Sequence, residues 1–87
     1  MKREYAHLDA LFSALAHRHR RAILDRLSVQ PSSISRLASE LMLSLPAIHK
    51  HIAILEKANL LQRKKNGRSY FLALRRNALA SLRHWIE

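Results

Sequence analysis

The sequence contains no cysteine, and this absence removes several classes of chemistry at once. Without thiols the chain can form no disulfide, build no thiolate metal site and carry out no thiol catalysis. The lack of disulfides fits the reducing cytosol, and we expect a cytoplasmic protein. The chain has one glycine, Gly67, so it also lacks the usual glycine-rich phosphate-binding loops, and we expect no enzymatic activity.

Long apolar runs are also missing. The N-terminal stretch MKREYAHLDALFSAL begins with basic residues, but His7, Asp9 and Ser13 interrupt its apolar positions, which argues against a signal peptide. No run approaches the length of a membrane span, so we expect no membrane partner. The 87 residues fit one domain, residues 1–87, which is too small to bury a large fraction of its surface. Dimerisation would compensate for a core of this size.

Acidic residues are scarce. Six Asp and Glu stand against sixteen Lys and Arg, which gives a formal net charge of +10. The first 43 residues hold seven basic and four acidic groups, and the last 44 hold nine and two. A strongly basic domain favours a polyanionic partner, either nucleic acid or an anionic membrane surface. The membrane is less favoured here, because the basic groups gather near one predicted hairpin and not along an amphipathic helix.

Apolar residues recur at steps of three and four in several segments, which is the spacing of one helix face. They predict a first helix over residues 4–16. The basic run HRHRR (17–21) interrupts the pattern, and a short second helix resumes it at Ile23. A third helix is predicted near 34–41 and a last one near 78–86.

A fourth helix has clear start and stop signals. Ser44 is a good N-cap, and Pro46 falls in the first turn, where a missing N–H costs nothing. Asn59 is a plausible left-handed stop. The expected buried stripe of this helix consists of Leu45, Ile48, Ile52 and Leu55.

Two strands are predicted after this helix, near 60–65 and 68–74. Asn66-Gly67 between them is a strong hairpin signal, because a type I′ turn needs positive φ at both central positions. We expect Tyr70, Leu72 and Leu74 to alternate toward one face. The predicted fold is mainly α with a two-stranded β-hairpin, in the order α-α-α-α-β-β-α.

The third and fourth predicted helices are short, close together and capped, which is typical of a helix-turn-helix. In that motif the first helix braces the second, whose outward side can enter the DNA major groove. On a helical wheel the outward side of the fourth helix carries small, polar or cationic residues. These are Pro46, His49, Lys50, Ala53 and Lys57, with Ala47 at the margin and Ser44 at the start.

The predicted hairpin adds basic residues directly after this helix. Its tip could lie against the sugar-phosphate backbone or in an adjacent minor groove. The residues concerned are Arg63, Lys64, Lys65, Asn66, Gly67 and Arg68. A capped helix pair is common and a basic tip is usually a solvated turn, but their conjunction is less ordinary. The pattern therefore predicts a helix that reads bases and a hairpin that holds phosphates.

Three segments resemble the ArsR (arsenical-resistance-repressor) family of bacterial winged helix-turn-helix transcriptional regulators. They are ALAHRHRRAILDRL, ISRLASELMLSLPAIHKHIAILEKANLL and RKKNGRSYFLAL, and the resemblance covers about residues 8–86. It implies a homodimeric repressor that binds double-stranded DNA at an inverted-repeat operator. His49 and Lys50 fall at family positions for base or phosphate contacts, although the family more often has Ser in place of His49. Gly67 and Arg68 match the tip of the wing, which is the family's hairpin.

The resemblance also implies that the first and last helices form the dimer interface. The residues agree, because these two segments carry more apolar surface than the ends of a small monomer need. The expected interface residues are Leu8, Leu11, Phe12, Leu15, Leu79, Leu82, Trp85 and Ile86.

Two metal sites known in the family have poor counterparts here. Ser33 and Ser35 stand where a Cys-x-Cys pair would lie, and hydroxyls are poor ligands for soft metals. His84 and Glu87 fit half of a second site, but no ligand lies near Leu72–Leu74 to complete it. The six histidines, His7, His17, His19, His49, His51 and His84, show no complete ligand spacing. We therefore expect no metal and no cofactor, and a structural hydrogen-bonding role for His51.

One alternative function stays open. A winged-helix module that binds protein or RNA would keep the same core and hairpin without specific DNA binding. The salt dependence of DNA binding would separate the two functions.

Overall fold

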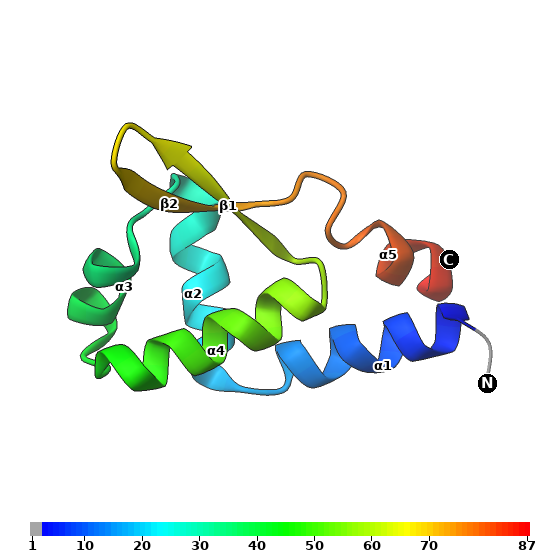
Figure 1. The fold of residues 1–87 in the computed structure, drawn as a ribbon. Coiled ribbons are helices and arrows are strands. Elements are labelled where there is room, and N and C mark those ends of the chain that lie inside the picture. Colours follow the sequence, from blue (N-terminus) through cyan, green and yellow to red (C-terminus); the bar gives the residue numbers. More distant parts are fainter. Residues whose placement is uncertain (1–2) are drawn as a thin grey trace.

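Five helices and one antiparallel hairpin follow each other in the predicted order, which confirms the mainly α fold class (Figure 1). The computed structural model describes residues 3–87. The elements are α1 (Arg3–Leu15), α2 (Arg18–Val29), α3 (Ile34–Leu41), α4 (Leu45–Lys57), β1 (Leu61–Asn66), β2 (Ser69–Leu74) and α5 (Ala80–Ile86). Within that part of the chain, every helix is too short or too polar to cross a membrane.

The junction of α1 and α2 differs from the prediction. Only the first residue of the basic run HRHRR lies outside the helices, because His17 is the N-cap of α2 and the arginines belong to the first turn of α2. Two of these arginines fold back onto the end of α1. Arg20 donates to the carbonyls of Ser13 and Ala14, both at 2.9 Å, and Arg21 donates to that of Leu15 at 2.7 Å. The basic run thus donates to carbonyls of the last turn of α1, where helices leave carbonyls without helical partners, although the Ser13 carbonyl also accepts the Ala16 N–H.

The helix-turn-helix pair has the predicted caps. The Ser44 hydroxyl accepts the Ala47 N–H at 3.2 Å, and Pro46 lies in the first turn of α4. Met42 ends α3 in the left-handed conformation, with φ of 56°, and Asn59 after α4 has φ of 59°. Local sequence signals therefore set both ends of α4 as expected.

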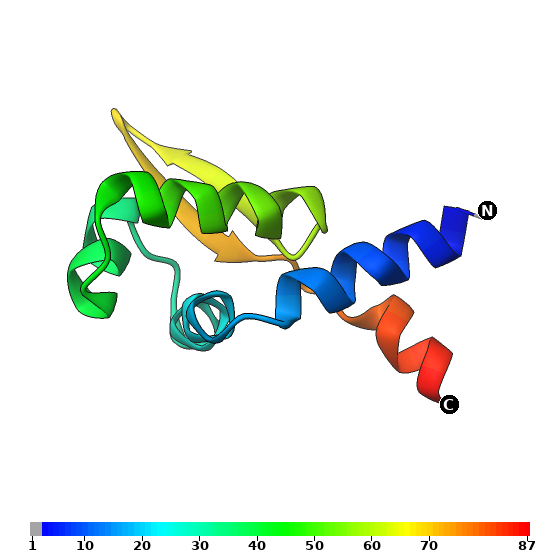
Figure 2. The ribbon, with the colours of Figure 1, turned by 90° about the horizontal axis from the view of Figure 1, so that it is seen from below.

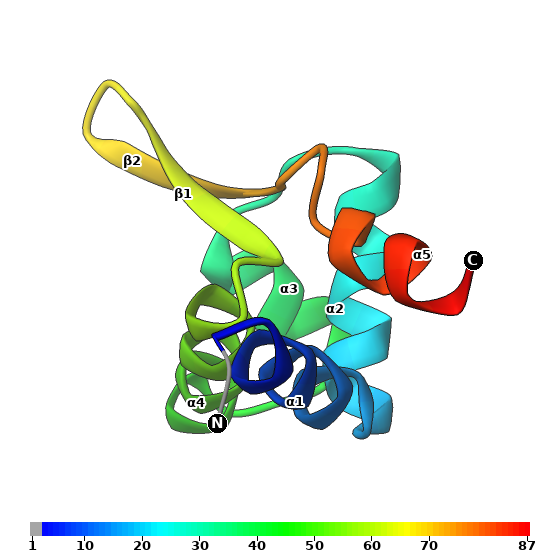
Figure 3. The same ribbon diagram turned by 90° about the vertical axis from the view of Figure 1, so that its right-hand side faces the viewer.

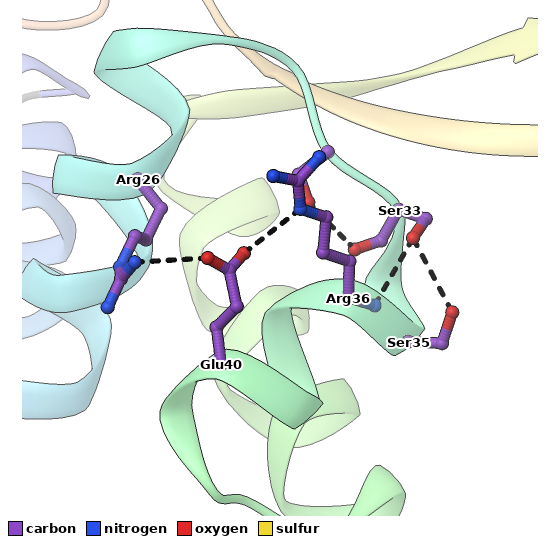
Figure 4. Close-up of polar contacts among 6 residues, drawn as sticks. Arg26, Ser33, Ser35, Arg36 and Glu40 are labelled. Atoms are coloured by element: carbon purple, nitrogen blue, oxygen red, sulfur yellow. Dashed lines mark hydrogen bonds and ion pairs between the residues drawn. The ribbon is translucent and has the colours of Figure 1, made fainter.

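Ion pairs tie α3 to α2 (Figure 4). Glu40 accepts from Arg26 at 3.0 Å and pairs with Arg36 at 3.3 Å. Ser33 caps α3 by accepting the Arg36 N–H, and its hydroxyl lies 3.4 Å from that of Ser35. Each exposed pair contributes little stability alone, about 0–1 kcal/mol. The Arg26–Glu40 pair joins α2 to α3, and the Arg36–Glu40 pair lies within α3.

The hairpin turn lies one residue later than predicted. Asn66 pairs with Ser69, so the central turn residues are Gly67 and Arg68. Gly67 has φ of 65°, whereas Asn66 does not have positive φ. Positive φ at the first central position, occupied by glycine, is the pattern of a type II′ turn and not of type I′. The predicted alternation in β2 also fails at Tyr70, which is exposed, because only the base of the hairpin touches the helices.

The base of the hairpin joins the helical core. Leu72 and Ser32 exchange two backbone hydrogen bonds, from the Ser32 N–H at 3.0 Å and from the Leu72 N–H at 2.7 Å. Leu72 and Ala73 are buried there. The core cluster draws apolar residues from α1 to α4 and from both strands. The tip of the hairpin consequently projects beyond the helices (Figure 3).

Two residues were assigned to the wrong surface by periodicity. Leu11 is fully buried within the single chain, so it has no surface left for a partner and cannot belong to the dimer interface. Leu45, predicted to be buried, is 52% exposed because it lies at the start of α4, beyond the body of the core. The other three residues of the predicted stripe, Ile48, Ile52 and Leu55, are fully buried.

The views agree on the arrangement of the elements. The start of α1 and all of α5 lie side by side at one end of the molecule, while α3 and the start of α4 lie at the opposite end (Figures 1 and 2). The hairpin rises from the middle. The molecule thus separates a terminal face from the region that holds the helix-turn-helix.

Candidate nucleic-acid interface

The outward side of α4 is an open surface. Pro46, His49, Lys50, Ala53 and Lys57 are exposed, and Ala47 is half-buried. The opposite side of the helix is anchored by Ile48, Ile52 and Leu55 in the core. Because that anchoring is rigid, the structure presents the predicted residues together along one ridge.

The N-terminal end of α4 combines cationic and apolar groups. Its first turn carries no acidic residue, and helix N-termini favour anions. Two apolar side chains that the sequence analysis did not assign to this surface lie beside it, Met42 at 92% exposed and Leu45 at 52%. Apolar side chains at such positions can contact the methyl group of thymine. The left-handed cap at Met42 is what turns this side chain outward, and no periodicity rule indicates it.

The hairpin tip, which we define as residues 64–68, is exposed along its whole length. It contains Lys64, Lys65, Asn66, Gly67 and Arg68. The Lys65 ammonium lies 5.8 Å from the centroid of the Tyr70 ring on the paired strand. This cation–π contact limits the freedom of one lysine and leaves its charge at the surface.

Arg63 has a different environment from the tip. Its guanidinium forms two parallel hydrogen bonds to the Glu56 carboxylate, at 3.0 and 3.1 Å. These bonds, opposed by partial burial, raise the pKa of Arg63 above its ordinary value. The pair joins the last turn of α4 to β1, and it compensates the charge of Arg63.

Comparisons with known proteins agree with this architecture. The helix-turn-helix domain family matches residues 15–63. The HTH-type transcriptional regulator Rv2034 of Mycobacterium tuberculosis is 35% identical over 79 residues, which cover 91% of this chain and 74% of that protein. An ArsR family transcriptional regulator of known crystal structure is 34% identical, with a TM-score of 0.86, and the match covers 99% of this chain and 89% of that one.

This chain belongs to the ArsR family of winged helix-turn-helix transcriptional regulators. A more distant structure shares the fold alone, at 18% identity and a TM-score of 0.80. It is a homodimeric winged helix-turn-helix DNA-binding domain from Mycobacterium bovis, and the match covers 99% of this chain and 83% of that one.

The terminal face of this ArsR family regulator is apolar and exposed. We define it as Tyr5, Phe12, Leu79, Trp85 and Ile86, all of which are large and exposed hydrophobic residues. Phe12 and Trp85 pack edge to face, with ring centroids 5.6 Å apart and an interplanar angle of 78°. Three further residues of the predicted interface, Leu8, Leu15 and Leu82, are half-buried and pack against the core cluster.

The residues at the family's known metal positions have other environments in this structure. Ser33 caps α3, while His84 and Glu87 lie exposed on and after α5. A different histidine group was missed by the sequence analysis. His17 and His19 from the α1–α2 junction meet His51 of α4, which joins residues more than thirty positions apart.

Burial, followed by the positive charge of its neighbours, lowers the pKa of His51 below its ordinary value. His17 shows the same direction for the same leading cause, with Arg20 next in importance. His51 also accepts from Arg20, at 3.4 Å from Nη1 to Nδ1. This contact agrees with the hydrogen-bonding role expected for His51 from the sequence.

Proposed function

We propose that this ArsR family regulator is a homodimeric repressor that binds a specific double-stranded DNA sequence in the bacterial cytoplasm. α4 enters the major groove, and the hairpin tip lies on the sugar-phosphate backbone. The observation that carries the proposal is the pairing of two exposed basic surfaces on one rigid frame. The outward side of α4 and the hairpin tip are both exposed, and the Arg63–Glu56 pair joins the last turn of α4 to β1.

Charge supports DNA as the partner. Glu56 is the only acidic residue of α4 and of both strands, and Arg63 already compensates it. A phosphate backbone that contacts α4 and the hairpin therefore meets no uncompensated acidic side chain from these elements. Small side chains at Pro46, Ala47 and Ala53 let the helix approach base edges closely.

A twofold dimer would bind an inverted repeat, because each subunit presents one α4 to one half-site. The terminal face supplies an apolar surface suited to self-association, and the M. bovis relative is itself a homodimer. A dimer bound to a promoter blocks the binding of RNA polymerase without any contact to the polymerase itself. This favours a repressor over an activator.

The test is selection of DNA from a random pool by the purified protein, followed by affinity measurements across salt concentrations. We expect an inverted-repeat consensus. If each dimer contacts about six phosphates, the log-log salt slope should be about −5. A shallow slope without sequence preference would reject DNA reading and favour the alternative module that binds protein or RNA.

Substitutions on α4 should change specificity. Lys50→Ala and His49→Ala are each expected to weaken operator binding by about 5- to 150-fold, because a good base contact contributes about 1–3 kcal/mol of discrimination. Binding to random DNA should fall less. Fluorescence anisotropy with the selected operator and a scrambled duplex measures both. Lys57→Ala is the matched control, since Lys57 lies on the same side at the far end of α4. Equal losses on both duplexes would assign Lys50 and His49 to phosphates only.

Substitutions at the hairpin tip should act on all sequences alike. Lys64→Ala, Lys65→Ala and Arg68→Ala combined are expected to weaken operator and random DNA similarly and to flatten the salt slope by about 1 for each lost phosphate contact. Arg63→Ala has the same charge change per residue but removes a paired cation, so its effect on the slope should be smaller. A triple variant with the wild-type slope would remove the hairpin tip from the interface.

A further inference from the structure

The histidine cluster, His17, His19 and His51, brings three imidazole rings together on one side of the α1–α2 junction. Ring centroids lie 4.7 Å apart for His17 and His51, 5.2 Å for His17 and His19, and 5.7 Å for His19 and His51. One ring nitrogen from each residue lies within 4.8 Å of the other two. All three side chains are half-buried, so the cluster is a shallow built site and not a group of freely moving surface rings.

We propose that the histidine cluster binds a divalent transition-metal ion, with Zn²⁺ as the ligand of choice. Three neutral imidazoles and one water make a tetrahedral zinc site, and imidazole is a ligand that zinc accepts readily. Carbonyl- and carboxylate-seeking ions such as Ca²⁺ and Mg²⁺ find no oxygen donors among the three side chains. The inference departs from the absence of metal expected from sequence spacing.

The geometry requires only small adjustments. Tetrahedral zinc with bonds of about 2.0–2.1 Å separates its nitrogen ligands by about 3.4 Å. Closing the cluster from its present spacing takes side-chain rotations that move each ligand nitrogen by about 1 Å. His19 can rotate without loss, because its backbone N–H, and not its ring, makes the capping bond to His17.

Two hydrogen bonds compete with the ion. The Nδ1 atom of His17 accepts the His19 N–H at 3.1 Å, and that of His51 accepts from Arg20. A neutral ring that accepts at Nδ1 carries its proton on Nε2. The ion must therefore take the place of the donor at Nδ1, or shift the proton there and break the same bond. Binding thus exchanges two hydrogen bonds for metal bonds, which lowers the net affinity.

The surrounding charge opposes the binding of a metal ion. Arg18, Arg20, Arg21 and Lys50 are cationic and repel a dication. Metal binding requires the neutral form of each imidazole. Among the described residues, the hydrogen bonds of these rings include none to a carboxylate. We therefore expect a dissociation constant of roughly micromolar size and not the tighter binding of supported zinc sites.

Calorimetric titration of the full chain with zinc chloride tests the site, and cobalt absorption checks its geometry. We expect one Zn²⁺ per protomer, a tetrahedral Co²⁺ spectrum and a higher Tm with zinc. His19→Gln, which keeps the cap on α2, should weaken zinc binding at least tenfold and abolish the Tm increase. His51→Gln should do the same.

His84→Gln is the matched control, since it removes an exposed histidine at the opposite end of the molecule. Unchanged zinc affinity in this variant is expected. Loss of zinc binding in His84→Gln with retention in His19→Gln and His51→Gln would overturn the proposal. So would a wild-type protein that binds no zinc at a zinc concentration 100-fold above the expected dissociation constant. Circular dichroism of each variant verifies that the helices are intact, and the measurements need no DNA.

Discussion

Replacing Leu11 with glutamate is expected to unfold the protein and not to yield a folded monomer. Leu11 is fully buried in the core cluster, together with Ile23 and Leu55. Truncating a buried leucine costs about 2–5 kcal/mol. A carboxylate at the same point adds the desolvation of a charge for which the core offers no partner. The sum is comparable with the whole stability of a small domain, about 5–15 kcal/mol.

Urea denaturation followed by circular dichroism measures this effect, and the adjacent residue supplies the control. Phe12→Glu places the same charge one position along α1, where the wild-type side chain is 44% exposed. We expect Phe12→Glu to keep a cooperative transition and Leu11→Glu to lose it. A Leu11→Glu protein with the wild-type denaturation midpoint would show that the buried position of Leu11 is wrong.

Local signals predicted the helix-turn-helix well. Ser44, Pro46 and Asn59 each act through bonds or torsions within a few residues, so the sequence contains the whole cause. Both ends of α4 were consequently placed within one residue of the observed bounds. The outward ridge of α4 followed directly, because a fixed helix phase decides which residues lie opposite a buried stripe.

Boundaries that depend on contacts between elements were predicted less well. HRHRR has no apolar periodicity, yet it begins α2, because Arg20 and Arg21 find their partners on the preceding helix. The turn at Gly67 was misplaced by one residue, since the register is set by pairing along both strands and Asn66-Gly67 is only a local preference. Leu11 and Phe12 share one apolar stripe, and only the packing of α1 decides which is buried.

Pairs between different elements have no signal in the sequence. Arg63 has the sequence context of the other wing cations, but it pairs with Glu56 of α4. His51 lies more than thirty residues from His17, and ligand spacing along one segment cannot reveal such a group. Side-chain function in this family member therefore depends on which elements the fold places together, even where the elements themselves are predictable.

Replacing Trp85 with glutamate is expected to give a folded monomer with weak operator affinity. Trp85 is 57% exposed and packs edge to face on Phe12, so its removal costs the single chain little core packing. In the proposed dimer the same side chain would lie in an apolar seam, where a carboxylate from each subunit would be desolvated and repelled by its twin. Dimerisation should fail for that reason.

Loss of the dimer should weaken operator binding by about 10²- to 10⁴-fold, because each half-site must then be bound without the effective concentration that a linked partner provides. Sedimentation velocity and fluorescence anisotropy measure the two effects. Val29→Glu is the matched control, since it makes the same apolar-to-acidic change at a side chain that is 81% exposed at the end of α2. We expect this control to remain dimeric and to lose only the small affinity that one added negative charge removes. If Trp85→Glu stayed dimeric with operator affinity equal to that of Val29→Glu, the subunits would have to meet through a surface other than the terminal face.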